Sequence, residues 1–516
     1  MVMTSLQINR VRGPVLWLPW IGLMIQFIVS STPDNMLCSL LAAVTGWLLL
    51  WDSFRNERWQ AFPLSSFLLL GFAIVKSLGP LYFTAMEGHT VIYNLAVPVR
   101  VFSHLTLVSL VAISSHWLYR KLNWLTSLRH GLARVLAGPL AVHQPLSRGA
   151  VLLLFALGCG GWGAAAFFDP TGEGLLAVKI TEGFTLLSTS IVILVIRPLL
   201  ERNGVPPKPL DLQLLGIGMV GLLMLSFAVN TRSAFAIPLL TLALALMLEA
   251  LLSLIKVTFP AALAAVLALV LVMPFLSNLA TTIVLAREYR GSVGPAELVS
   301  LTLDQLSRSE ELSERRKEDQ EAGANDWDEV YLNNVFLARF CNLKFDDNAL
   351  SLEQSLTSAG REFYLTYNLE RLYATAPKYI LSLFSIENED KLTINSRSFG
   401  DELYVLATGD SYARGGFRTG HFIGSDFAIF GWWYLALLAL FLAPFYALID
   451  GLQARPSGSI LLNPLAITQL VPLLTLSNAE SLASLLQLVL RSMPQAVLTF
   501  TIAAWIGRRC FPLSKA

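Results

Sequence analysis

Long apolar runs alternate with short polar stretches along most of this chain. The runs recur at about 20 residues, the length at which an α-helix crosses the hydrocarbon core of a bilayer. The pattern therefore predicts an all-α polytopic membrane protein with about twelve transmembrane helices. They are expected at residues 13–30, 35–51, 62–83, 98–119, 149–168, 178–196, 210–230, 233–255, 259–281, 426–449, 459–476 and 484–507.

One long polar segment interrupts this pattern late in the chain. Residues 286–424 hold about half of all charged residues. Their first part is a dense mixed-charge run that is typical of solvated helix or disordered chain. After Trp327, aromatic and aliphatic residues recur at helical spacing, which predicts short amphipathic helices that cap the membrane bundle. We therefore divide the chain into an N-terminal membrane bundle (1–285), a loop domain (286–424) and C-terminal spans (425–516).

Composition supports a membrane protein. The chain has 516 residues, of which 54% are hydrophobic and 14% charged, whereas about 25% are charged in a soluble globular chain. The net charge of +1 and the lack of a basic tail give no indication of nucleic-acid binding. The spacing of the four cysteines fits neither a metal site nor a disulfide framework.

Lysine and arginine predict the orientation of the bundle. With the N-terminus inside, the short loops on the inner side carry the basic residues, and the outer loops 31–34, 84–97, 169–177 and 477–483 carry none. Such an excess of basic residues marks the cytoplasmic side. We expect a bacterial inner membrane protein with both termini in the cytoplasm and residues 286–424 in the periplasm.

Basic residues on the outer half of the membrane are the first candidates for a functional site. Arg232 lies at the tight outer turn before the eighth span, and Arg491 lies inside the last span. A guanidinium at these depths needs a partner, and a diphosphate suits it because arginine binds phosphate oxygens with two parallel hydrogen bonds. Arg100 and Lys179, at span ends, fit snorkelling to the headgroups, and Lys76 lies inside the third span.

The second candidate region is the return stretch, Thr408–Tyr434, where the chain re-enters the membrane. Its glycines predict a flexible loop whose exposed amides can approach an anion. His421 is a candidate general base. Asp426 and Asp410 are competing bases, although Asp426 at a helix start could instead be a cap. The stretch also holds two candidate anion-binding residues four positions apart, Arg414 and Arg418.

A third set lies in the loop domain, where its members could bind phosphate or sugar hydroxyls, or form domain salt bridges that contribute little. Arg339 is the preferred candidate among them. The other members are Lys344, Asp346, Asp347, Arg361 and Arg371.

Several familiar catalytic motifs are absent from the sequence. It contains no phosphate-binding GxxxxGK[ST] loop, no HExxH and no GxSxG. We therefore expect no metal and no other cofactor. Transfer from a pre-activated lipid diphosphate needs only cations for the leaving group and a base or orienting group for the acceptor.

The layout and three short stretches resemble the Wzy-type polysaccharide polymerases and the related O-antigen ligases. Many spans, one large outer loop late in the chain and a few spans after it are shared with these families. The similar stretches are NTRSAFAIPLLTLAL (Asn230–Leu244), ATAPKYILSLFSIENEDKL (Ala374–Leu392) and GSDFAIFGWWYLALLAL (Gly424–Leu440).

The resemblance implies an undecaprenyl-diphosphate-linked oligosaccharide as donor and attack of an acceptor sugar on its anomeric carbon with inversion. It implies that outer arginines hold the diphosphate, here Arg232 together with Arg339, Arg414 or Arg418. A chain-length regulator and a flippase are the implied partners. Ligases typically have His followed by Asn or Ser near the end of the outer loop, whereas Phe422 follows His421 here, which favours a polymerase.

We therefore expect a metal-independent membrane glycosyltransferase that makes O-antigen or exopolysaccharide. Three alternatives remain. A ligase would transfer a finished glycan to a lipid or protein acceptor. A lipid-linked glycan transporter would also have about twelve spans, and Lys76 points in that direction. A non-catalytic scaffold predicts that Arg232, His421 and Asp426 do not converge in space.

Overall fold

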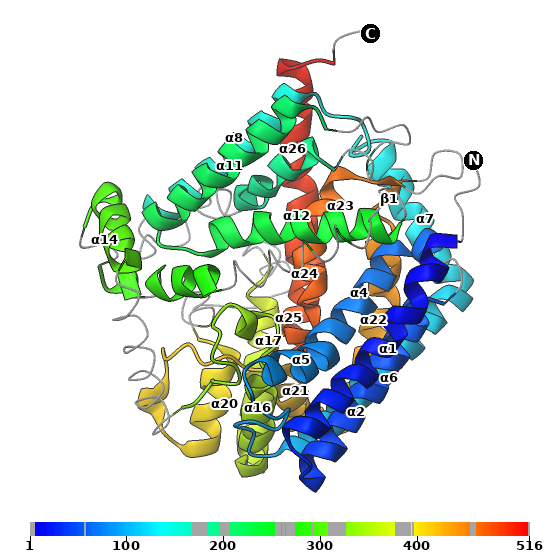
Figure 1. The fold of residues 1–516 in the computed structure, drawn as a ribbon, viewed down its shortest axis with the longest axis vertical. Coiled ribbons are helices and arrows are strands. Elements are labelled where there is room, and N and C mark those ends of the chain that lie inside the picture. The colour runs from blue at the N-terminus through cyan, green and yellow to red at the C-terminus, as the bar shows by residue number, and fades with distance from the viewer. Residues whose placement is uncertain are drawn as a thin grey trace.

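A computed structural model gives the fold of the chain (Figure 1). The structure describes residues 6–55, 58–167, 183–196, 200, 207–252, 260, 264, 274–283, 285–289, 293–307, 327–376, 394, 397–454 and 461–513.

The first spans form a tilted helical bundle. It consists of α1 (Leu6–Val29), α2 (Pro33–Ser53), the continuous series α4 (Pro63–Ala73), η1 (Ile74–Leu78) and α5 (Gly79–Met86), and α6 (Pro98–Lys121), with the one-turn α3 (Arg58–Ala61) before α4. Proline opens α2, α4 and α6, where its fixed φ suits a helix and its missing N–H would have had no partner. Helix α2 packs against α1, α4 and α6. An additional helix, α7 (Asn123–Ala137), follows α6.

The third span contains a π-helical turn, η1, for a reason that the sequence supplies. Pro80 lacks the N–H that would bind the carbonyl of Lys76 in an α-helix. The ladder shifts by one residue, and the Gly79 N–H binds the carbonyl of Ile74 instead. The last span contains a second π-helical turn, η7 (Leu488–Ser492). Pro494 follows it, and the Met493 N–H binds the carbonyl of Leu488. Such turns are frequent at functional sites.

A second group of helices packs beside the first bundle. It contains α8 (Arg148–Phe167), the 3₁₀-helical η2 (Thr185–Leu194), α11 (Pro209–Ala228) and α12 (Ser233–Leu251). Gly158 allows α8 to lie directly on η2, since a Cβ there would fall 2.1 Å from the backbone nitrogen of Ser188. Helix α12 contacts α11 and η2 and crosses the view at mid-height in Figure 1.

The polar segment folds in two separate places. After η3 (Ala286–Tyr289), α14 (Pro295–Ser307) packs on α11, where Val299 contacts a small core around Phe227 and Ile283. The labelled helices among the remaining elements lie in the lower half of Figure 1. These elements are η4 (Leu337–Arg339), α16 (Lys344–Ser355), α17 (Ser358–Tyr373), α20 (Phe399–Thr408), η5 (Ser411–Ala413) and α21 (Phe422–Phe430).

The C-terminal region departs from the expected regular spans. Gly431, with φ of +52°, separates α21 from α22 (Trp433–Asp450), so the helix expected at 426–449 is broken. A short hairpin of β1 (Gln453–Ala454) and β2 (Leu461–Leu462) follows. The span expected at 459–476 is instead α23 (Pro464–Thr468), α24 (Leu470–Leu474) and η6 (Leu476–Asn478). The chain ends with α25 (Leu482–Gln487), η7 and α26 (Met493–Cys510).

Eight helices among the described residues are long and apolar enough to cross a membrane. They confirm a multi-pass helical membrane protein. The helices expected at 149–168 and 178–196 are represented by shorter apolar helices, Arg148–Ala164 and Thr185–Leu194, and most of 259–281 lies outside the described residues. The twelve-span arrangement stays a prediction.

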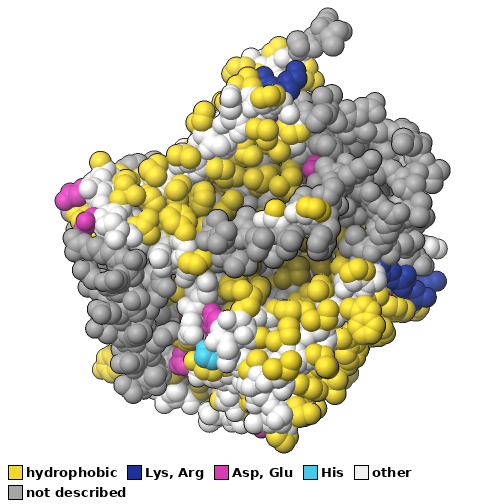
Figure 2. All heavy atoms as spheres, viewed as in Figure 1, with side chains coloured by type: hydrophobic (Ala, Val, Ile, Leu, Met, Phe, Trp, Pro, Cys, Tyr) yellow, Lys and Arg dark blue, Asp and Glu magenta, His cyan; other side chains and the backbone are white. Residues whose placement is uncertain are grey.

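Apolar side chains cover much of the visible surface, while Lys and Arg gather at its upper and right edges (Figure 2). The start of α1 and the end of α26 both lie in the upper half of Figure 1, opposite α16 and α20. The side of the membrane on which each end lies stays a prediction.

The polar segment also packs against side chains of the third span. A Cβ on Gly79 would lie 2.9 Å from the Cβ of Cys341, and Gly79 lies inside the span Pro63–Met86, seven residues before its end. Tyr331 is fully buried and its hydroxyl donates to the carbonyl of Val91. Irregular backbone at this depth is tolerated because protein, and not lipid, surrounds it.

Candidate functional site

Three ionisable side chains meet where the polar segment enters the bundle. Lys76 on η1 donates to the two carboxylate oxygens of Asp346 on α16 over 2.9 and 3.2 Å. Its Nζ lies 3.1 Å from Nε2 of His421, and Nδ1 of His421 lies 3.3 Å from the Asp346 carboxylate. No side chain of this junction cluster (Lys76, Asp346, His421) is more than 2% exposed. The cluster joins the third span, the polar segment and the return stretch.

Burial governs protonation in the junction cluster. It raises the pKa of Asp346 to about 6, although Lys76 opposes the shift. Burial and the neighbouring Lys76 hold the pKa of His421 well below its usual value. A neutral His421 can donate from Nε2 to the carbonyl of Ser477 and accept at Nδ1 from the Ile423 N–H. Both ring nitrogens are then engaged within the protein, so His421 in this conformation holds elements together and has no nitrogen turned to a substrate.

Asp426, the second predicted base, is also buried. It lies on α21, and its carboxylate accepts the N–H of Leu482 over 2.8 Å, at the start of α25. Burial raises the pKa of Asp426 well above its usual value. It therefore caps a different helix from the one on which it lies. His421 and Asp426 thus converge on the same segment, 477–482, which leads into the last span.

The acidic face of α16 secures the rest of this junction. Asp347 accepts the N–H groups of Ala96 and Val97 over 2.9 and 2.8 Å, at the start of α6. It also pairs with Lys344 over 2.9 Å. Six residues further along α16, Glu353 bridges Arg100 and Arg361. Lys344, Asp347 and Arg361 thus form salt bridges, one of the two roles that the sequence left open for them.

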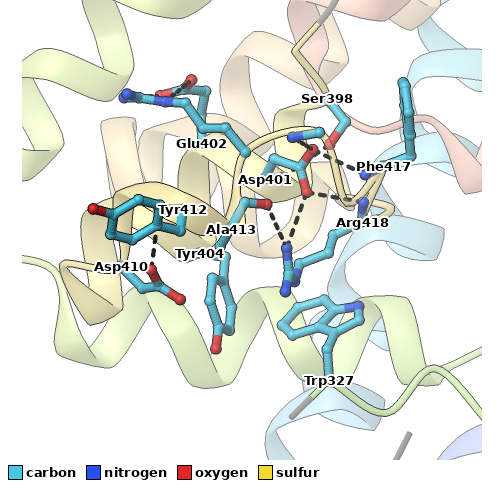
Figure 3. Close-up of polar contacts among 12 residues, drawn as sticks. Trp327, Ser398, Asp401, Glu402, Tyr404, Asp410, Tyr412, Ala413, Phe417 and Arg418 are labelled. Atoms are coloured by element: carbon cyan, nitrogen blue, oxygen red, sulfur yellow. Dashed lines mark hydrogen bonds and ion pairs between the residues drawn. The ribbon is translucent and has the colours of Figure 1, made fainter.

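The glycine-rich part of the return stretch is fixed by a carboxylate of the protein itself (Figure 3). Asp401 on α20 accepts the N–H groups of Gly415, Phe417 and Arg418 over 3.2, 3.0 and 3.0 Å. Gly415 and Phe417 have positive φ values of 89° and 53°. The exposed amides that we expected to bind a ligand anion therefore bind Asp401, because it lies buried directly beneath the loop.

The two arginines of this loop are paired with α20 as well. Arg414 makes two hydrogen bonds to Glu402, over 2.9 and 3.2 Å. Arg418 reaches Asp401 and the carbonyl of Ala413, and its guanidinium lies over the ring of Tyr404 (Figure 3). Asp410 is exposed, and its carboxylate caps η5 by accepting the N–H of Tyr412. Of the three predicted bases, Asp410 alone has an exposed side chain.

Arg232 lies apart from the junction cluster. Arg232 is half-buried at the start of α12, which lies at mid-height in Figure 1 while α16 and α21 lie at the bottom. Arg339 is exposed at the end of η4. The structure therefore brings His421 and Asp426 together but leaves Arg232 apart from them, which is the arrangement that a non-catalytic scaffold predicts.

Arg491 differs from every other predicted arginine. It lies on the π-turn η7 inside the last span, is partly exposed, and makes no hydrogen bond or ion pair with the described residues. One turn earlier, Gln487 donates to the carbonyl of Arg371 at the end of α17. Arg491 therefore lies one helical turn into the last span from its contact with α17. Its neighbour Leu490 is 61% exposed.

The opposite end of the bundle holds a second ionic network that we did not predict. His116 on α6 contacts Asp52 through Nδ1 (2.9 Å) and the Ser65 hydroxyl through Nε2 (3.1 Å). Ser65 donates to Asp450 over 2.7 Å. The order Asp–His–Ser matches a catalytic triad. However, Ser65 is fully buried and its proton points to Asp450, so it is no nucleophile in this structure. We call these four residues the basal network.

From the sequence, Lys76 had no assigned partner, and Asp346 was one of six loop-domain residues that could bind phosphate or sugar hydroxyls or form domain salt bridges. The signal that could have found the junction cluster is the single lysine within the third span, since such a charge needs a carboxylate at the same depth. The described residues contain no group of three or more His, Cys, Asp or Glu that could hold a metal ion.

The chain matches no protein-family model, no curated protein and no solved structure.

Proposed function

We propose that this protein polymerises polyprenyl-diphosphate-linked oligosaccharide repeat units at the outer face of a bacterial inner membrane. The observation that carries the proposal is Arg491. A guanidinium within a span is costly without an anionic partner, and the described residues give Arg491 none. Its partly exposed position beneath the polar segment suits the diphosphate of a lipid that arrives from the bilayer.

The reaction would form a bond between an acceptor hydroxyl oxygen and the anomeric carbon of the donor sugar. The bond from that carbon to the diphosphate breaks, and the acceptor proton passes to a base. In this proposal Arg491 stabilises the leaving diphosphate, since arginine keeps its charge and can hold two oxygens at once. Asp410 is the base that an acceptor can reach, and His421 is a positioning residue.

The junction cluster supports an outer site indirectly. It fixes the polar segment over the third span and fixes 477–482, the segment that leads to Arg491. A lysine within a span was the feature that favoured a transporter. Its carboxylate partner belongs to the polar segment, so this lysine is used for docking that segment.

The test is the glycan profile of a strain that lacks the protein, complemented with the wild type or with Arg491→Gln, Arg491→Lys or Arg509→Gln at equal protein levels. Arg509 lies exposed near the end of α26 with its guanidinium over Trp505, and it serves as the matched control. We expect Arg491→Gln and Arg491→Lys to shorten the chains and accumulate single repeat units on the carrier lipid, while Arg509→Gln leaves the profile unchanged.

The profile of the deletion strain separates the alternatives. Single repeat units on the carrier lipid support a polymerase. Long chains stranded on the carrier would replace it with a ligase, and lipid-linked units trapped on the inner face would replace it with a transporter. Wild-type chain lengths in Arg491→Gln would overturn the assignment of Arg491.

Asp410→Asn and His421→Gln separate the two roles within the site. We expect Asp410→Asn to lower the rate by about 10²-fold, the usual contribution of a general base. His421→Gln should lower the rate in proportion to the loss of folded protein. A larger loss for His421→Gln at equal thermal stability would return the role of base to His421.

A further inference from the structure

Helix α7 (Asn123–Ala137) has two apolar faces that meet along its length. One face is buried against the bundle. Leu125 and Leu136 are fully buried, and Leu132 packs so closely on Gly451 that a Cβ there would lie 2.8 Å from it. Arg129 anchors this face by donating to Gln453 over 3.1 Å. The helix therefore has a fixed rotation about its axis.

The second apolar face is exposed. Trp124, Leu128 and Val135 are 58%, 37% and 47% exposed. At about 100° of rotation per residue, they share one face with Gly131, at which an added Cβ would meet nothing within 4 Å. The chain thus presents a row of large apolar side chains, about three turns long, that no described residue of the protein covers.

The third face of α7 is polar and basic. His130 and Arg134 are exposed on it, and Lys121 is exposed at the end of α6 directly before α7. Residues 121–148 contain no Asp or Glu. An apolar face beside a basic face is the pattern of a helix that lies in the membrane interface, with its apolar side in the acyl boundary and its cations at anionic headgroups.

The exposed apolar face also continues a surface that meets lipid. Trp117 and Leu118, near the end of the span α6, are 54% and 38% exposed, and α7 begins a few residues later. We propose that α7 is an interfacial helix that binds the anionic headgroup layer of the membrane at the basic end of the bundle. This inference does not depend on the proposed enzymatic function.

The test places a fluorophore on either side of α7 in the full-length protein. Cys159→Ser and Cys510→Ser remove the accessible cysteines, while Cys38 and Cys341 are buried. A Leu128→Cys variant is labelled with an environment-sensitive dye, and His130→Cys is the matched control on the polar face. The proteins are placed in lipid nanodiscs, which leave both membrane faces open to solvent.

We expect brominated acyl chains to quench the dye at position 128 and aqueous iodide to quench the dye at position 130. Strong iodide quenching at both positions would overturn the proposal, because α7 would then stand in water and its apolar face would be free for a protein partner. Equal quenching by brominated lipid at both positions would overturn the assigned orientation.

A second measurement tests the charge. Native mass spectrometry of the protein with mixed phosphatidylglycerol and phosphatidylcholine should show preferential retention of phosphatidylglycerol. The Lys121→Gln and Arg134→Gln changes should each lower that preference by about fivefold, the contribution of one basic residue near an anionic surface. Arg361→Gln, at the other end of the bundle, should leave it unchanged. No preference in the wild type would overturn the anionic-lipid assignment.

Discussion

The junction cluster and the basal network are both buried and ionic, but their charges are satisfied in different ways. In the basal network Asp450 accepts the N–H groups of Leu64 and Ser65 at the start of α4. Asp52 has two arginine partners, Arg58 and Arg120, whose side chains are each 13% exposed. These charges rely on backbone amides and on cations that reach water. In the junction cluster, Asp346 has two possible ion-pair partners among the described residues, Lys76 and His421. Of these, only Lys76 is permanently charged at neutral pH.

This difference separates two uses of buried charge. Asp450, at the end of α22, caps the start of α4 by accepting its backbone N–H groups. It therefore joins two helices of the membrane bundle to each other. Lys76 and Asp346 are 270 residues apart and join the bundle to the polar segment. A carboxylate that depends on one distant cation must keep an unpaired buried charge or take up a proton when that cation is lost, and either change destabilises the fold at neutral pH. The junction should therefore be the more sensitive of the two sites.

The largest effect is expected from Lys76→Met. Asp346 would lose its cation, so we expect a loss of about 3–5 kcal/mol in the free energy of unfolding at pH 7. Thermal unfolding in detergent measures it. The Lys76→Met/Asp346→Asn double variant should recover at least half of the loss. Lys344→Met is the control, since Asp347 keeps the amides of Ala96 and Val97. Equal losses for Lys76→Met and Lys344→Met would contradict the comparison.

The Lys76→Met loss should also depend on pH. Without the lysine, folded Asp346 holds its proton at pH 7, whereas with it the pKa is about 6. The difference in the free energy of unfolding between the wild type and Lys76→Met should therefore shrink by about 1.4 kcal/mol for each pH unit from pH 8 to pH 6. Below pH 6 it should level off, because Asp346 is then protonated in both folded proteins. A loss that stays constant over this range would contradict the assignment of the charge to Asp346.

Asp450→Asn tests the basal network and should have the next largest effect. The amide cannot accept as strongly from the two backbone N–H groups and from the hydroxyls of Ser65 and Tyr119, so we expect a loss of about 2–3 kcal/mol in the free energy of unfolding. Asp52→Asn should cost about 1 kcal/mol, because Arg58 and Arg120 can turn to water. The same thermal measurement decides the order. A larger loss for Asp52→Asn would show that cations contribute more here than backbone amides.

Asp401→Asn extends the comparison to a carboxylate of the polar segment that is satisfied by amides. The change weakens three backbone hydrogen bonds, and we expect the loop to open more readily by about 2 kcal/mol. Hydrogen exchange at Phe417 and Arg418 should accelerate, while exchange in α22 stays unchanged. Asp410→Asn is the exposed control. Unchanged exchange in Asp401→Asn would show that glycine conformation and the arginine contacts hold this loop without Asp401.

The smallest effect is a dependence on pH at His421. Its pKa is lowered in the folded protein, so the unfolded chain binds a proton more readily. The stability that a neutral His421 contributes is complete above pH 6.5 and is lost as the pH falls below it, by up to about 1.4 kcal/mol per unit. His421→Gln should therefore destabilise most above pH 7 and progressively less towards pH 5. A difference that grows on acidification would mean that His421 is charged in the fold.

The sequence predicted the spans best where apolar runs were long and bounded by proline, as in α2, α4 to α5, and α6. It failed at Gly431 and between Pro464 and Asn478, where hydrophobicity continues although the helix breaks. Hydropathy does not distinguish a helix in lipid from short helices buried in protein, because both need apolar side chains. It also did not reveal α7, whose apolar and basic residues were interpreted only as a basic inner loop.

The candidate site shows the same division. From the sequence alone we predicted that His421, Asp426 and four of the five candidate arginines lie near the outer face, and that Lys76 and Arg491 carry charge inside spans. The tertiary structure alone decided the partners: Asp346 for Lys76, Asp401 for the glycine-rich loop, Glu402 for Arg414, and no described residue for Arg491. The charge and the hydropathy of a residue are local properties that sequence contains. A partner hundreds of residues away is fixed only when folding removes both groups from water and leaves each to satisfy the other.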